Sequence, residues 1–101
     1  MRGTDGMAAI WFRNEEDGFK NWCEEHRCSF LVNANYKPVR SYLVLHKVGC
    51  AAFIKRGNLT GPLYAKLCSD SIDDLRSTVR RETDTKDFSH ICKRCCPPTS
   101  G

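Results

Sequence analysis

Two short motifs that combine histidine and cysteine contain the residues of this sequence best suited to chemistry. The first runs from His46 to Cys50 with three residues between them, and the second runs from Cys92 to Cys95 with two between them. The members of each motif can converge on one ion if the chain turns between them, and Gly49 suits such a turn. One imidazole nitrogen and three thiolates form a ligand set that suits tetrahedral zinc. The spacing therefore predicts one Zn²⁺ ion bound by His46, Cys50, Cys92 and Cys95.

A zinc ion held by four protein ligands is structural rather than catalytic. Catalytic zinc usually keeps three protein ligands and an open position for water or substrate. Near the two motifs, the sequence contains no residue resembling the glutamate that a zinc hydrolase or deaminase needs. Cys23 and His26 could form a nucleophile and its base, yet no third group that would orient the histidine is evident. We therefore expect a protein that is not an enzyme.

Neighbouring residues leave other interpretations open. His90 and Cys96 flank the second motif, and either could replace one of its members. The residues of the first motif could also simply end a strand and fill the core, since free cysteine is commonly buried. A second-ranked ligand set would resemble the plant-type and transposase-derived zinc fingers of the WRKY–GCM kind, whose strand signatures are missing here. That set consists of His90, Cys92, Cys50 and Cys68.

Length and composition limit the class of protein. At 101 residues, with 41% hydrophobic and 28% charged residues, the chain has room for one soluble domain with a small core. Its seven cysteines are an odd number, and its first residues lack the long apolar run of a secretory signal. Metal binding in a reducing, cytoplasmic compartment is therefore favoured over a disulfide framework. The longest apolar stretches are too short to span a bilayer, so we expect no membrane association.

A helix is predicted near the start of the chain. Asn14 followed by three acidic residues is typical of a helix start, because both features complement the exposed N–H groups there. Phe19 and Trp22 begin an apolar face at helical spacing, which predicts a helix over residues 15–27 and a place for both rings in the core. The preceding residues, 1–13, are expected to form a loose segment.

Short strands and a second helix follow. Turn-forming residues separate stretches rich in strand formers, and the first two stretches are predicted to form a hairpin. Ser69 or Ser71 is expected to cap the second helix, whose apolar stripe contains Ile72, Leu75 and Val79. The predicted strands cover residues 28–34, 41–47, 51–55 and 63–68.

This order of elements predicts an α+β fold, a small antiparallel sheet flanked by two helices and stapled by one structural zinc ion. The second helix and its connector would carry the chain back across the sheet and bring Cys92 and Cys95 to the first motif. The zinc-binding domain is expected to cover residues 14–96, and residues 97–101 are expected to form a disordered tail. Cys68 is assigned to the core.

Three phrases taken together resemble a small zinc-binding domain of bacterial proteins. They are DGFKNW, YLVLHKVGC, and YAKLCSDSIDDLRSTVRRE running into ICKRC. The resemblance covers about residues 15–96, and the positions that match its ligands are those of the two motifs. It implies a DNA-handling context, because such domains occur beside restriction-type or HNH nucleases. No nuclease motif is present in this chain, so the resemblance implies a nuclease or another protein as a partner.

The charge pattern favours nucleic acid as the binding partner. The net charge of +4 is mild but compatible with DNA binding. Lysine and arginine neutralise phosphates, and Tyr36 or Tyr42 could stack on a base. We therefore expect a zinc-stabilised, non-catalytic nucleic-acid-binding module with DNA as its target. The residues predicted to contact nucleic acid are Lys37, Arg40, Lys47, Lys55, Arg56, Arg76 and Arg80.

Two alternative functions remain. The apolar residues 51–54 could form a sheet edge that pairs with a protein partner, which would make the zinc purely architectural in a protein–protein interaction module. The adjacent thiols of Cys92, Cys95 and Cys96 could instead form a redox or metal-responsive switch, because nearby basic residues lower thiol pKa values. Zinc-bound thiolates are mostly protected, so the switch is the weaker of these hypotheses.

Overall fold

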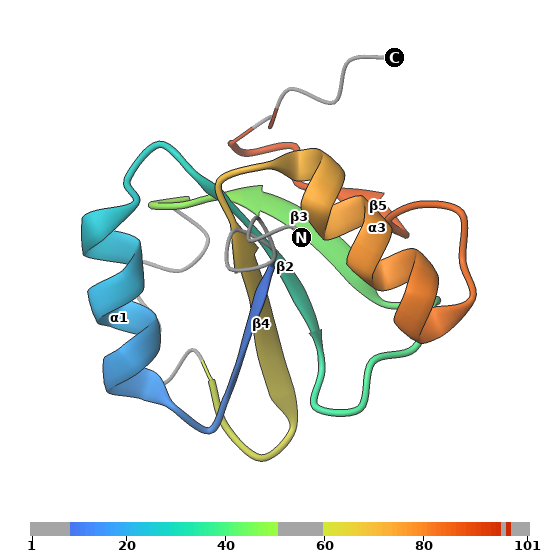
Figure 1. Cartoon of the computed structure of the whole chain (residues 1–101), viewed down its shortest axis with the longest axis horizontal. Coiled ribbons are helices and arrows are strands. Elements are labelled where there is room, and N and C mark those ends of the chain that lie inside the picture. The colour runs from blue at the N-terminus through green and yellow to red at the C-terminus, as the bar shows by residue number, and fades with distance from the viewer. Residues whose placement is uncertain (1–8, 51–59, 96, 98–101) are drawn as a thin grey trace, which may run out of the picture.

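A five-stranded sheet with one helix on each face forms the described part of the chain (Figure 1). The structure is a computed structural model, and it describes residues 9–50, 60–95 and 97. The strand order across the sheet is β1-β4-β2-β3-β5, and the predicted α+β class is confirmed. In chain order the elements are β1 (Ile10–Arg13), α1 (Glu16–Glu25), β2 (Phe30–Asn35), β3 (Leu43–Lys47), β4 (Tyr64–Ser69), α3 (Ile72–Thr83) and β5 (His90–Ile91).

The sheet is mixed, whereas an antiparallel sheet was predicted. The pairs β1–β4, β2–β4 and β2–β3 are antiparallel, but β5 runs parallel to β3. Parallel pairing needs a crossover connection, and α3 supplies it by carrying the chain from β4 over β2 and β3 to the sheet edge. The last strand therefore runs in the same direction as the strand that ends in the first metal motif.

Alternate residues of the central strands face different helices. Val32 of β2 pairs with Leu67 of β4, and both belong to the fully buried cluster that packs under α3. The next pair along, Leu31 and Cys68, faces the other way and packs with Phe19 of α1. This period of two is the signature of a sheet covered on both faces. The predicted core positions of Phe19 and Cys68 are confirmed, and each large apolar side chain buried here contributes about 1.5–3 kcal/mol.

The start of α1 differs from its prediction. Asn14 does not cap the helix; its φ of 53° places it in the left-handed region, which asparagine tolerates better than most residues. Glu15 stands at the N-cap without a side-chain cap. A distant residue instead fixes the backbone just before the helix, because the backbone N–H of Glu15 donates to Thr60 Oγ1 at 2.9 Å. The backbone N–H of Thr60 in turn donates to Glu16 Oε1 at 2.7 Å.

Strand boundaries agree with the sequence in the middle of the chain and differ at its start. The predicted strands 28–34, 41–47 and 63–68 correspond to β2, β3 and β4. The segment 1–13 was expected to be loose, but its last four residues form β1, which pairs with β4. The strand predicted at 51–55 lies outside the described residues.

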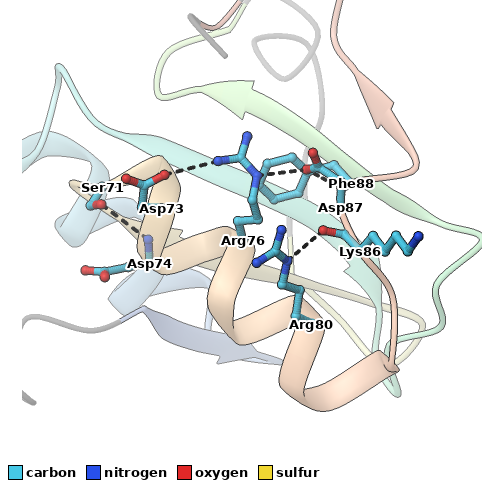
Figure 2. Close-up of polar contacts among 8 residues, drawn as sticks. All are labelled: Ser71, Asp73, Asp74, Arg76, Arg80, Lys86, Asp87 and Phe88. Atoms are coloured by element: carbon cyan, nitrogen blue, oxygen red, sulfur yellow. Dashed lines mark hydrogen bonds and ion pairs between the residues drawn. The ribbon is translucent and has the colours of Figure 1, made fainter. Parts of the chain in front are cut away.

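Helix α3 begins as the sequence predicts. Ser71 is its N-cap, and the Ser71 hydroxyl accepts a hydrogen bond from the backbone N–H of Asp74 at 3.2 Å (Figure 2). Asp84 ends the helix in the left-handed conformation, with a φ of 55°. Neither α1 nor α3, the helices of the described residues, is long and apolar enough to cross a membrane.

Arg76 fastens the connector that leads from α3 to β5 (Figure 2). Its guanidinium donates to Asp73 on the same helix and to Asp87 on the connector, both at 3.1 Å. The same group lies 5.5 Å from the ring centroid of Phe88, whose ring packs against the core under α3. Ser89 follows, and its backbone N–H donates to the carbonyl of Leu43 at 2.9 Å. These contacts set the point at which the chain enters β5.

Candidate metal centre

The parallel pairing of β3 and β5 brings the two cysteine motifs together. Leu45 of β3 is in register with Ile91 of β5. Because the strands run in the same direction, the residues that follow this pair, His46 and Cys92, lie toward the same end of the sheet. The backbone N–H of Cys92 donates to the carbonyl of Leu45 at 2.9 Å and extends the pairing by one step. An antiparallel β5 would have carried the second motif to the opposite end.

A tight turn after β3 brings the second ligand of the first motif back toward the first. The backbone N–H of Val48 donates to the carbonyl of Ser29 at 2.9 Å, and that of Cys50 donates to the carbonyl of Lys47 at 3.2 Å. Gly49 adopts a φ of 83° at the tip of the turn. A side chain is strained in that conformation, so glycine is the residue that this turn requires.

The four predicted ligands form one compact cluster. The ligand atoms of His46, Cys50, Cys92 and Cys95 all lie within 4.8 Å of one another. The sulfurs of Cys50 and Cys92 are 3.7 Å apart. With Zn–S bonds of about 2.3 Å, two sulfurs on one tetrahedral ion would be separated by about 3.8 Å. A disulfide bond is only about 2.05 Å long, so the spacing fits two sulfurs sharing an ion rather than bonded to each other.

Burial and local hydrogen bonds support this cluster. His46 and Cys50 are buried, and Cys92 and Cys95 are half-buried. The backbone N–H of Lys47 donates to the sulfur of Cys95 at 3.2 Å. A donor aimed at sulfur favours the thiolate form, which is the form that binds metal.

The thiols of the second motif have pKa values that differ from the ordinary one. Burial raises the pKa of Cys92, but the backbone N–H groups of Cys95 and Arg94 and the neighbouring thiols oppose it, and the net direction is downward. Burial raises the pKa of Cys95 to about 12. A divalent ion supplies the charge that stabilises several thiolates at once.

The alternative ligands are not part of the described cluster. His90 is exposed on β5, and its Nδ1 lies 3.0 Å from the hydroxyl of Ser89. Cys68 is fully buried in the core beneath α1. The set that would resemble the WRKY–GCM fingers is therefore not assembled here. Cys96 lies outside the described residues.

A polar pair that the sequence did not suggest lies at the end of α1. His26 Nδ1 is 2.9 Å from Asp70 Oδ1, and the hydroxyl of Ser29 donates to the same oxygen. These hydrogen bonds, from Ser29 first and His26 second, lower the pKa of Asp70. The imidazole of His26 also stacks on Trp22, with ring centroids 4.2 Å apart. No sequence pattern links His26 to Asp70, because they are 44 positions apart.

The sequence suggested Cys23 as a nucleophile with His26 as its base, but the structure does not pair these two residues. Burial raises the pKa of Cys23 to about 11, so this thiol is protonated at neutral pH. The imidazole of His26 is turned to Asp70 instead. Cys23 lines a shallow surface pocket with Glu24, Arg27, Val48 and Gly49.

The basic residues predicted to contact nucleic acid do not form one group. Lys37 and Arg40 are exposed in the turn between β2 and β3, and Lys47 is exposed beside the metal cluster at the opposite end of β3. Arg76 donates hydrogen bonds to Asp73 and Asp87 and lies over the ring of Phe88, as described above. Arg80 is exposed on α3, and its Nε donates to the carbonyl of Lys86 at 2.7 Å (Figure 2). Lys55 and Arg56 lie outside the described residues.

The chain matches no protein-family model, and comparisons with curated proteins and with solved structures gave no significant match. The described residues define an α+β protein with one group of four side chains that could bind a metal ion.

Proposed function

We propose that this chain is a zinc-stabilised, non-catalytic module that binds nucleic acid, with DNA as its expected target. The observation that supports the metal is the cluster of one imidazole and three thiols within 4.8 Å. Three sulfur donors favour zinc over magnesium or calcium, which prefer oxygen ligands. Four protein ligands fill a tetrahedral coordination shell, so such an ion would be structural.

The zinc would connect parts of the chain that otherwise hold together weakly. Strand β5 has two residues, both exposed, and it pairs with the sheet along one side only. A metal joining His46 and Cys50 to Cys92 and Cys95 closes a loop of about forty residues, which favours the folded state. Apparent zinc affinities of such sites are worth about 10–16 kcal/mol, which is comparable to the whole stability of a small domain.

The metal is tested by native mass spectrometry of protein purified without added metal, before and after treatment with a strong chelator. We expect one zinc ion per chain and loss of the folded charge-state distribution when it is removed. A metal-free protein that remains folded would contradict the zinc proposal.

Nucleic-acid binding is tested separately, by anisotropy titrations of labelled DNA at several salt concentrations. A steep fall in affinity with rising salt is expected, because cations released from the phosphates accompany binding. A salt-independent signal, or no binding at low salt, would contradict this part of the proposal. Unchanged rates of hydrolysis of nucleic-acid and peptide substrates with and without the protein would support the non-catalytic assignment.

A further inference from the structure

Charge is distributed unevenly along this chain. Residues 26–69 contain seven lysines and arginines and no aspartate or glutamate. All twelve acidic residues lie before or after that stretch, which contains β2, β3 and β4. The three central strands and their turns therefore provide cations, whereas the acids belong to α1, α3 and their flanks.

One end of the sheet combines these cations with exposed apolar side chains. Four of the six large hydrophobic residues that are exposed in the described part of the chain lie in the two neighbouring turns there or at the first residue of β4. Figure 1 places these turns at the lower end of the sheet and the second metal motif at the upper end. We call this end the turn surface, and it consists of Tyr36, Lys37, Val39, Arg40, Leu63 and Tyr64.

The first tyrosine of the turn surface is held in place by its backbone. The N–H of Tyr36 donates to the carbonyl of Leu63 at 2.9 Å and joins the two turns. The carbonyl of Tyr36 accepts from Arg13 Nε at 2.8 Å, and the Arg13 guanidinium stacks over Trp11 at 4.2 Å. The same guanidinium lies 5.8 Å from the centroid of the Tyr36 ring, and Tyr36 nevertheless remains 39% exposed.

The second tyrosine is supported from the side. The ring of Tyr64 lies 5.9 Å from the ring of Tyr42. The hydroxyl of Tyr42 accepts a hydrogen bond from the amide of Asn33 at 2.9 Å, which anchors the supporting ring. Tyr64 is 46% exposed. Of the two tyrosines suggested by the sequence, Tyr36 is thus available to a ligand and Tyr42 supports Tyr64 instead.

We propose that the turn surface binds single-stranded nucleic acid, with bases stacking on Tyr36 and Tyr64 and phosphates contacting Lys37 and Arg40. This inference rests on the proposed nucleic-acid-binding function and adds the surface and the form of the ligand. Aromatic rings beside cations are the arrangement that proteins use for single strands, because every unpaired base has a face that can stack. In a duplex those faces are covered by neighbouring bases, so exposed tyrosines would add little to its binding.

Charge and location support the same occupant. The exposed cations of residues 26–69 attract a polyanion, and the stretch itself contains no acidic residue. The carboxylate of Glu16, which reaches this stretch from α1, is hydrogen-bonded to Thr60. The surface begins where β2 ends and β3 starts, whereas His46 lies at the other end of β3. The nucleic acid would therefore contact side chains distant from the residues that bind the metal ion. The zinc would affect nucleic-acid binding only by stabilising the fold.

The test uses the full zinc-loaded chain and compares binding of a labelled single strand with binding of a duplex of the same sequence. Tyr36→Ala and Tyr64→Ala are each expected to weaken single-strand binding about fivefold or more, because one stack is lost. Tyr36→Phe and Tyr64→Phe keep the ring and should bind like the unmodified protein. Thermal unfolding of each variant shows whether the fold is retained.

A charge variant provides a second measurement that does not depend on the tyrosines. Replacing Lys37 and Arg40 by glutamine should weaken single-strand binding and reduce the slope of log affinity against log salt by about 1.4, since each phosphate contact contributes about 0.7. Replacing the exposed Arg81 and Lys86 by glutamine changes the net charge equally at another place. That matched control should leave the slope nearly unchanged.

The outcomes separate this inference from the proposed function. Tight duplex binding that none of the turn-surface variants alters would overturn the inference and leave DNA binding intact. Absence of binding to either form at low salt would overturn both. Equal losses in the two charge variants would show that only net charge matters, and this would also overturn the assigned surface. Binding of an acidic, apolar peptide to the turn surface, with no binding of any oligonucleotide, would also overturn the inference.

Discussion

The sulfurs of Cys50 and Cys92 lie 3.7 Å apart, although the two residues are 42 positions apart in the sequence. Nothing local enforces this approach. It follows from the parallel pairing of β3 and β5, which places residue 92 beside residue 46, and from the turn that returns Cys50 to the same end. The candidate metal centre therefore depends on the order of the strands, and an ion bound there would stabilise that order.

Removing one thiol of the cluster should cause loss of the metal ion and destabilise the fold. Cys50→Ser and Cys92→Ser each leave three ligands, and we expect zinc content to fall well below one ion per chain. Because the zinc contributes about 10–16 kcal/mol, the variants should be largely unfolded or much less stable at room temperature. Metal content by mass spectrometry and urea unfolding by circular dichroism measure the two effects.

Cys28→Ser is the matched control for the ligand variants. Cys28 is exposed and lies outside the cluster, so its substitution should keep the zinc and change stability by less than about 0.5 kcal/mol. If Cys28→Ser lost the metal as readily as Cys92→Ser, the assigned ligand set would be wrong.

Gly49→Ala should destabilise the protein through backbone conformation alone. No atom lies within 4 Å of the position that a Cβ would occupy at Gly49, but the φ of 83° is unfavourable for any residue with a side chain. A cost of about 1–2 kcal/mol is expected in urea unfolding. Gly61 also has open space around the Cβ position and no such φ, so Gly61→Ala should be nearly neutral. Equal effects at the two glycines would exclude the conformational explanation.

Cys68 should make stability fall at alkaline pH. Burial raises the pKa of this thiol, and the folded protein therefore retains its proton at pH values where the unfolded chain has lost it. Its contribution is fully present below the unfolded value of about 8.5 and is lost as pH rises toward the higher folded value, by up to about 1.4 kcal/mol per pH unit. Urea unfolding of zinc-loaded protein from neutral to alkaline pH measures this slope.

Cys68→Ala provides the comparison for the alkaline slope. The substitution leaves a cavity in the core beneath α1 and lowers stability at neutral pH. Because the titrating thiol is gone, however, the variant's stability should decline less steeply above about pH 8.5 than that of the unmodified chain. Parallel curves for the two proteins would show that other groups cause the decline.

Several of the features predicted correctly from the sequence are encoded within a few residues. The spacing of His46 to Cys50 and of Cys92 to Cys95 is local, and so is the hydrogen bond from Asp74 to Ser71 that starts α3. Each depends on residues at most four positions apart. Local patterns of that kind can be interpreted without knowledge of the fold.

Features that depend on distant contacts were missed or misplaced. The start of α1 is set by Thr60, which lies 45 positions beyond Glu15, so the local cap signal at Asn14 was misleading. Strand β1 has four residues at the sheet edge, and its pairing with β4 joins segments far apart in the chain. The direction of β5 depends on the path of α3 across the sheet. Tertiary contacts decided these features, and a single sequence contains little record of them.

Arg76→Gln should loosen the end of the chain that supplies half of the metal ligands. The guanidinium of Arg76 bridges Asp73 and Asp87 and lies over Phe88, and its side chain is only 19% exposed (Figure 2). Both carboxylates are largely exposed, so the ion pairs themselves contribute little, but the ring contact and the packing of the side chain add to them. We expect a loss of about 1–2 kcal/mol in the free energy of unfolding.

Hydrogen exchange distinguishes this local role from general destabilisation. The amides of Ser89 and Cys92 donate to Leu43 and Leu45 on β3, and they should exchange faster in Arg76→Gln because the connector no longer holds β5 in register. Amides of β2 and β4 should change less, since those strands are paired on both sides. Arg81→Gln, at an exposed position on the same helix, should leave the β5 amides protected. Uniform acceleration across all strands would instead mean that Arg76 acts on global stability, and the zinc would then hold β5 in place without help from the helix.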